Sequence, residues 1–175
     1  CPNVACEGMA FGVDPKVVES VTKAVRKVTD KPVIVKLSPN VTDIVEIAKA
    51  VEAGGGNGVS LINTLLGMAI DIHRRKPVLG NTYGGLSGPA VKPVALRMVH
   101  QVYKGVTIPI IGLGGIMTGT DAIEFMMAGA QAVQVGTATM VDPTAISRIA
   151  REMSEYVEQY NLNSITDIVG AVHQG

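Results

Sequence analysis

Two glycine turns in the second half of the sequence are the segments best suited to hold a charged ligand. Residues 112–115 (Gly-Leu-Gly-Gly) directly follow the apolar run 108–111, and Gly136-Thr137 directly follows residues 132–135. Glycine lets the backbone approach an anion closely, and N–H groups at the start of the next helix favour negative charge. Glycine also ends helices and strands, so one such turn would be a weak signal. The pair predicts a parallel α/β protein that holds a phosphorylated ligand.

A lysine and two cysteines are the other residues whose types could do chemistry. Lys36 interrupts the apolar run 33–38, and a lysine in a buried strand is rare unless it is paired or binds an anion. The alternative is a lysine at a strand end that extends its amine to water. Cys1 and Cys6 are the only cysteines and have no histidine nearby, so we expect free thiols and no metal site.

Composition narrows the class of protein. The 175 residues fit one domain, and 47% hydrophobic content is sufficient for a core. Fifteen basic and fifteen acidic residues give zero formal charge, which argues against a nucleic-acid partner. No apolar run approaches the roughly 20 residues that span a bilayer. We also find no signal peptide, and we expect a cytoplasmic location.

Short apolar runs and helical periodicity alternate along the chain. Helical spacing and capping residues predict helices over residues 15–30, 44–53, 93–104, 120–128, 143–160 and 165–172. Apolar runs predict strands over residues 33–38, 59–63, 109–113 and 132–135. The glycine-rich residues 64–89 between them predict a long structureless loop, of the kind that acts as a lid or ligand loop.

This order of elements predicts the fold class α/β, specifically a TIM (β/α)₈ barrel. A complete barrel takes roughly 250 residues, and about four strands cannot close one. We therefore expect residues 1–175 to form the C-terminal half of a single barrel, with no second domain. The strands that begin near Val33 and Ala132 should each lack one neighbour, and the isolated polypeptide should be inactive and prone to associate through these edges.

Six motifs in a fixed order resemble one enzyme family. The chain strongly resembles the class 1, subclass B dihydroorotate dehydrogenases, specifically the catalytic subunit of the NAD-linked bacterial enzyme. The matching segments are residues 1–4 (CPNV), 35–40 (VKLSPN), 62–64 (INT), 84–88 (GGLSG), 112–116 (GLGGI) and 135–138 (VGTA). Together they extend over most of the chain, although any one of them would be unspecific.

The resemblance implies a role for individual residues. Cys1 matches the catalytic base, and a thiolate can accept a proton when its surroundings favour ionisation. Asn3, Asn63 and Thr64 match substrate contacts, although Asn63-Thr64 could also be a plain strand-end turn. Ser38, Asn40, Asn81 and Ser87 lie in the same loops and are left unassigned. Lys36 matches the family's lysine that contacts the flavin at its N1–O2 edge. The other positions that match cofactor contacts are Ile62, Gly88, Gly114, Gly115, Gly136 and Thr137.

The resemblance also implies an activity and its partners. It implies FMN-dependent oxidation of dihydroorotate to orotate in pyrimidine biosynthesis, within a homodimer that is part of a heterotetramer. A partner subunit would hold FAD and a [2Fe–2S] cluster and pass electrons to NAD, because this chain has too few cysteines for the cluster and no Rossmann fingerprint. Two alternatives stay open: a flavin barrel that reduces pyrimidines, similar to dihydropyrimidine dehydrogenase, and an inactive half-barrel that binds only phosphate or a partner.

Overall fold

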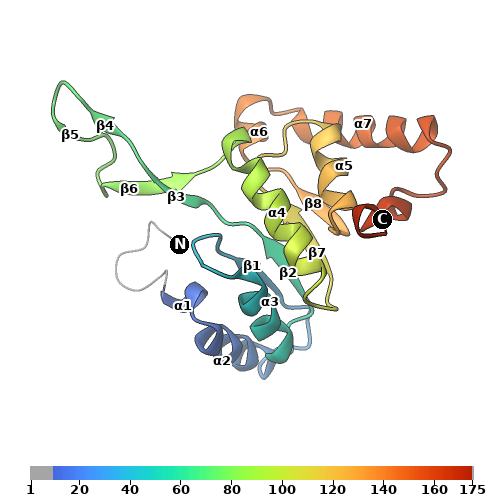
Figure 1. Ribbon diagram of the computed structural model, residues 1–175, viewed down its shortest axis with the longest axis horizontal. Helices are drawn as coiled ribbons and strands as arrows, with labels where there is room; N and C mark the ends of the chain where they lie inside the picture. Colours follow the sequence, from blue (N-terminus) through green and yellow to red (C-terminus); the bar gives the residue numbers. More distant parts are fainter. Residues whose placement is uncertain (1–9, 175) are drawn as a thin grey trace.

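A four-stranded parallel sheet forms the centre of the molecule. The computed structural model describes residues 10–174, so Cys1, Asn3 and Cys6 lie outside the described residues. The strand order is β1-β2-β7-β8, and every neighbouring pair is parallel. Helices connect these strands along the chain, as the predicted α/β class requires, and β1 and β8 are the sheet edges within the described residues (Figure 1).

The first half of the chain forms the predicted elements together with α1, a four-residue helix that the sequence analysis did not predict. Asp14 caps the helix that follows it, because its side chain accepts a hydrogen bond of 2.8 Å from the Lys16 N–H. Asp43 caps the next helix in the same way, since its side chain accepts from the Val45 N–H over 2.8 Å. The elements are α1 (Ala10–Val13), α2 (Pro15–Arg26), β1 (Ile34–Leu37), α3 (Ile44–Ala53) and β2 (Gly58–Leu61).

The second half also follows the predicted order, with two differences. The region after β8 contains a separate five-residue helix, α6, which the sequence analysis missed, and the predicted last helix is two 3-10 turns. The elements are η1 (Pro89–Val91), α4 (Lys92–Tyr103), β7 (Ile110–Leu113), α5 (Gly119–Met127), β8 (Ala132–Gln134), α6 (Thr137–Val141), α7 (Ala145–Gln159), η2 (Ile165–Ile168) and η3 (Ala171–His173).

Residues 64–89 are not a structureless loop, and that prediction was wrong. They form an arm that extends away from the sheet (Figure 1). β3 (Leu65–Met68) pairs antiparallel with β6 (Tyr83–Leu86), and β4 (Ile70–Asp71) pairs antiparallel with β5 (Lys76–Pro77). Strand pairing therefore satisfies backbone groups in the paired segments of this connection, which a structureless loop could not provide.

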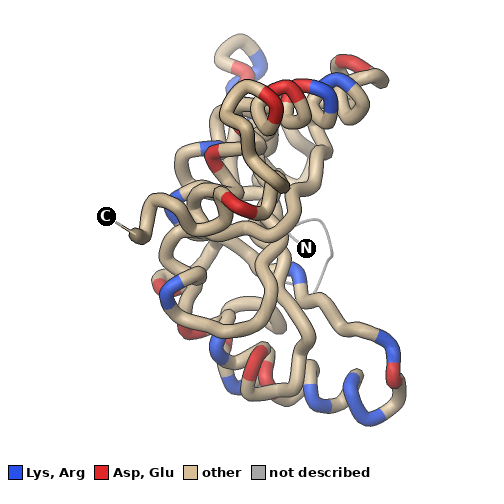
Figure 2. Tube along the Cα trace, turned by 90° about the vertical axis from the view of Figure 1, so that its right-hand side faces the viewer, with Lys and Arg blue, Asp and Glu red and all other residues tan. Residues whose placement is uncertain are grey.

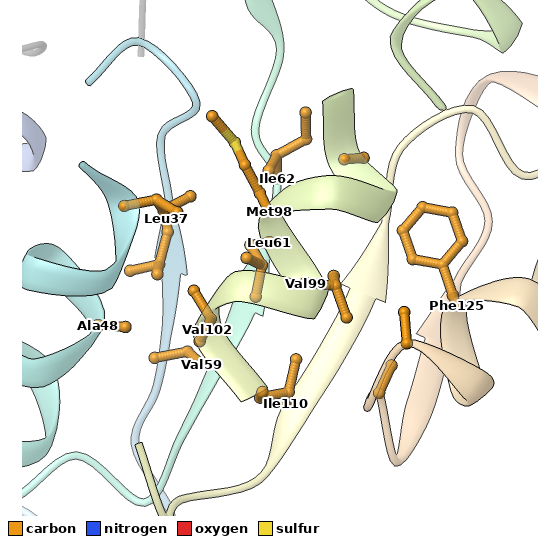
Figure 3. Packing of buried hydrophobic residues seen from close by; sticks show 14 of the residues in the cluster. Leu37, Ala48, Val59, Leu61, Ile62, Met98, Val99, Val102, Ile110 and Phe125 are labelled. Carbon is orange, nitrogen blue, oxygen red and sulfur yellow. The ribbon is translucent and has the colours of Figure 1, made fainter. Parts of the chain in front are cut away.

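The core lies where helices pack against the central strands. All residues of β2 are buried, whereas β1 and β8 are each exposed on part of their length. Figure 3 shows Val99 of α4 near Leu61 and Ile110 of the sheet, and Phe125 of α5 farther along, on the other side of β7. The side chains of these four residues are almost completely buried. The sheet is therefore held at its centre, and its edges are open within the described residues.

Charges of both signs are distributed over the helices. Figure 2 shows basic and acidic segments interspersed along the tube, which agrees with the balanced composition. Among residues 10–174, no helix has the length and apolar content that crossing a bilayer requires. The same residues contain no group of three or more His, Cys, Asp or Glu side chains that could hold a metal ion.

Candidate functional site

A pocket of about 260 Å³ lies at the carboxyl ends of the four parallel strands. In α/β proteins this edge is where ligands bind, because the loops that follow the strands converge there. The structure brings all of the described residues that were predicted to bind substrate or cofactor into its lining. They are Lys36, Ile62, Asn63, Thr64, Gly88, Gly114, Gly115, Gly136 and Thr137.

The first glycine turn needs glycine for its backbone and its packing. Gly114 and Gly115 have φ values of +130° and +78°, which L side chains rarely adopt. A Cβ on Gly115 would lie 2.7 Å from the Gly88 carbonyl oxygen and 2.9 Å from the backbone nitrogen of Lys92. The loop after β7 is thereby pressed against the start of α4, so these glycines form a closely packed wall of the pocket.

The second glycine turn is different, because it faces open space. A Cβ on Gly136 would meet no heavy atom within 4 Å, so packing does not require glycine at this position. A side chain here would instead occupy space beside the pocket that the residue lines. The open space beside Gly136 leaves room for a ligand in the pocket to approach the backbone closely.

One hydrogen bond joins the end of the arm to the turn after β8. The Thr137 hydroxyl donates to the Ser87 hydroxyl over 2.9 Å, and both residues line the pocket. Gly88 follows directly, is buried, and has a φ of +83°. Only the base of the arm reaches the pocket: Thr64 at one end and Leu86, Ser87 and Gly88 at the other line it, whereas the outer strands β4 and β5 contribute no lining residue.

Asn40 is a structural residue of the site that sequence reasoning left unassigned. Its Nδ2 donates to the Thr64 carbonyl oxygen over 3.1 Å, and its Oδ1 accepts from the Leu66 N–H over 2.8 Å. These two bonds fix the chain where it leaves β2 and enters the arm. Asn63 uses its own Oδ1 to accept from the Thr64 N–H over 2.9 Å, so its amide oxygen is engaged by the neighbouring backbone.

Lys36 lies in the pocket lining, but it is not buried as its apolar surroundings suggested. The residue is exposed, because β1 is a sheet edge among the described residues. Within residues 10–174 no carboxylate forms an ion pair with its amine. Its positive charge is thus available to an anionic or electron-rich group bound in the pocket.

An ion-pair cluster supports the packed wall from behind. The Lys92 amine contacts the carboxylates of Asp121 and Glu124, and the hydrogen bond that it donates to Asp121 raises the pKa of Lys92. Burial alone would raise the pKa of Asp121, but hydrogen bonds from Lys92 and from the Met117 and Thr118 N–H groups outweigh it and lower that pKa. The cluster therefore stays charged and holds the loop that follows the first glycine turn.

Comparison with known proteins places this arrangement in a family. The sequence profile described as dihydroorotate dehydrogenase matches residues 1–157, which is most of the chain. The chain belongs to the dihydroorotate dehydrogenase family. The resemblance inferred from six short motifs is thereby confirmed, and the TIM barrel of the family agrees with a parallel sheet connected by helices.

Curated relatives agree over nearly the whole chain. The chain is 64% identical over 173 residues to a protein of Desulforamulus reducens named dihydroorotate dehydrogenase B (NAD⁺), catalytic subunit. It is 60% identical over 172 residues to proteins of the same name from Alkaliphilus metalliredigens and Geobacter sulfurreducens. These matches include 98–99% of this chain but only 56–57% of each relative. The chain spans little more than half the length of these relatives.

Proposed function

We propose that the protein containing this chain oxidises dihydroorotate to orotate with FMN, and that these residues form one half of its barrel. The observation that supports this best is the convergence of residues from distant parts of the sequence on one pocket at the strand ends. A pocket alone would leave the chemistry open. Membership of the family, together with this convergence, favours the flavin enzyme over an inactive half-barrel.

The two glycine turns are suited to hold the phosphate of FMN. Gly136 and Thr137 offer open backbone and a hydroxyl, and Gly114 and Gly115 form the packed wall beside them. Lys36 lies in the same lining and would place its positive charge beside the N1–O2 edge of the flavin. When bound, FMN supplies a two-electron acceptor, and this chain supplies its position and the charge around it.

The substrate would lie between the flavin and the loops after β1 and β2. Asn63 and Thr64 line this side of the pocket and can match the donors and acceptors of a pyrimidine ring. Cys1, outside the described residues, is proposed as the base that takes the C5 proton of dihydroorotate, while the C6 hydride leaves to the acceptor. Asn3, also outside them, is proposed as a further substrate contact.

The electrons must then leave this subunit. We propose that a partner subunit with FAD and a [2Fe–2S] cluster passes them to NAD, since the two cysteines of this chain are too few to ligate such a cluster. The printed name "catalytic subunit" of the relatives supports a separate partner. A homodimer of the catalytic subunit within a heterotetramer and a cytoplasmic location complete the proposal.

Identification of the flavin tests the cofactor assignment directly. The full-length protein should release FMN, rather than FAD, when it is denatured and the supernatant is analysed chromatographically. Lys36→Met should retain less FMN and have a lower flavin reduction potential, because the reduced flavin loses a neighbouring positive charge. Release of FAD or of a phosphosugar would contradict the cofactor assignment, and an unchanged potential with full FMN content would contradict the role of Lys36.

Replacement of Cys1 tests the reaction. Cys1→Ala in the full-length protein should keep FMN and orotate binding. Its rate of dihydroorotate oxidation should be lower by a factor of roughly 10²–10⁴, the usual contribution of a general base. Cys1→Ser should retain some activity at higher pH, because a hydroxyl is a weaker acid than a thiol. Wild-type rates in both variants would exclude Cys1 as the base. Oxidation of dihydrouracil in preference to dihydroorotate would favour the related pyrimidine-reducing barrel.

A further inference from the structure

An arginine on the outer helix α7 contacts the chain segments that follow both glycine turns. The Arg148 Nη2 donates to the Met117 carbonyl oxygen over 3.1 Å, just after the turn that follows β7. Its Nε lies 3.5 Å from a carboxylate oxygen of Asp142, the C-terminal cap of α6. Since α6 begins at Thr137, one guanidinium group joins the segments that extend from the two turns.

Glu152 completes this connection from the next turn of α7. One of its carboxylate oxygens accepts from the Arg148 Nη1 over 3.0 Å, and the other accepts from the Gly119 N–H. A Cβ on Gly119 would collide with the Glu152 side chain, so glycine is what allows the helix α5 to start this close to α7. Arg148 and Glu152 therefore hold residues 117–119 from the outer side.

The same short segment is held on its inner side by Asp121. The Met117 and Thr118 N–H groups donate to Asp121 over 2.9 and 3.0 Å, and Lys92 contacts the other oxygen of that carboxylate. Met117 thus has both its N–H and its carbonyl bonded to charged side chains. Residues 117–119 form a rigid support between α4 and α7, and the first glycine turn is attached to this support.

We propose that Arg148 is a positioning residue that fixes the two glycine turns relative to each other and so sets the selectivity of the pocket for a phosphate group. The inference rests on the proposed function, because it takes FMN as the ligand. Arg148 does not line the pocket, so its effect would act through the position of the two turns. A phosphate held by both turns is sensitive to their separation, whereas the remainder of a flavin is not.

A neighbouring arginine provides a matched control. Arg151 also lies on α7 and also forms an ion pair with a glutamate four residues later, but its side chain is 70% exposed against 33% for Arg148. Within residues 10–174 Arg151 forms no hydrogen bond or ion pair with residues 117–119 or with Asp142. Exposed pairs of this kind contribute little to stability, so Arg151→Met measures the loss of a surface ion pair alone.

The test compares FMN with riboflavin, which lacks the phosphate. Apoproteins of the full-length wild type, Arg148→Met and Arg151→Met are titrated with each flavin, and binding is followed by fluorescence quenching. Arg148→Met should reduce the preference for FMN over riboflavin by about tenfold, the usual effect of losing a charged hydrogen bond, and Arg151→Met should leave it unchanged. Unchanged preference in Arg148→Met, or an equal loss for both flavins, would overturn the inference.

A second variant covers the case in which Arg148→Met does not fold. Asp142→Asn keeps the side-chain oxygen that accepts from the Thr144 N–H, but removes the charge that contacts Arg148. It should lower the FMN preference in the same direction, and a folded Asp142→Asn protein with wild-type preference would overturn the inference. A wild type that binds neither flavin would instead contradict the proposed function, so the two failures are distinguishable.

Discussion

Two glycine-rich regions of this molecule have different surroundings. The end of β7 and the turn that follows it contain Gly112, Gly114 and Gly115, and a Cβ on any of them would meet another atom at less than 3.0 Å. In the arm the surroundings change from one glycine to the next: a Cβ on Gly84 or Gly85 would meet a side-chain atom closer than 3.0 Å, whereas a Cβ on Gly80 would meet nothing within 4 Å. Glycine thus marks close packing throughout the turn but both close packing and open space in the arm. Glycine content alone does not distinguish a pocket wall from a projecting hairpin.

The apolar residues of the two regions differ in the same way. Around the turn, Ile110 and Ile116 are almost completely buried. The arm leaves a run of large apolar side chains exposed, namely Leu66, Met68, Ile70, Ile72, Val78, Leu79, Tyr83 and Leu86. An isolated two-stranded hairpin is marginally stable in water, so we expect the arm to depend on the rest of the molecule more than the sheet does.

The largest effect is expected from removing the aromatic ring beneath the first glycine turn. Phe125 is completely buried, and one of its ring carbons would lie 2.6 Å from a Cβ placed on Gly112. Phe125→Ala should therefore lower the free energy of unfolding by about 3–5 kcal/mol, through lost burial and a cavity. Tyr83→Ala on the arm, where the residue is 54% exposed, is the control. Urea unfolding of the full-length variants measures both, and equal losses would contradict the comparison.

A pair of glycine substitutions sharpens the comparison at a single residue type. Gly115→Ala combines a positive φ with a close approach to Gly88 and Lys92, so it should cost about 2–4 kcal/mol of stability and weaken FMN retention. Gly80→Ala has open space around it and should change stability by less than about 0.5 kcal/mol. Thermal unfolding and the flavin content of the purified proteins are the measurements. A neutral Gly115→Ala variant would refute the packed wall.

The smallest expected effect is a pH dependence of stability, which arises at His100 on α4. Burial, with contributions from His173 and Lys104, lowers the pKa of His100, whose ring stacks on that of His173 at 4.2 Å. The folded pKa lies below the unfolded value of about 6.5, so the unfolded chain binds the proton more readily. The contribution of neutral His100 to the free energy of unfolding is complete above pH ~6.5 and is lost as the pH falls through the folded pKa.

His100→Gln isolates this contribution. The variant cannot be protonated at this position, so its free energy of unfolding should decrease less than that of the wild type as the pH is lowered from ~8 to ~5.5. Urea unfolding at a series of pH values measures the difference. Parallel pH profiles for the two proteins would show that His100 has the same proton affinity in the folded and unfolded states.

Local signals in the sequence were sufficient for most of the elements. Asp14 and Asp43 cap the helices that the sequence predicted over residues 15–30 and 44–53, because a carboxylate before a helix satisfies N–H groups two or three residues away. The missed helix α6 begins at Thr137 without a side-chain cap and lasts only five residues. Such a helix is stabilised by its packing, which no local pattern reports.

The sequence by itself determined the family, the order of the central strands and helices, and the residue types that line the pocket. Only the tertiary structure decided that residues 64–89 form a paired arm. Leu65 pairs with Leu86 although the two residues are far apart in the sequence, and no turn motif in the sequence indicates this pairing. It also decided that Lys36 is exposed, because strand exposure depends on the neighbours in the sheet. The role of Arg148 belongs to the same class: three segments meet at its guanidinium only after the chain has folded.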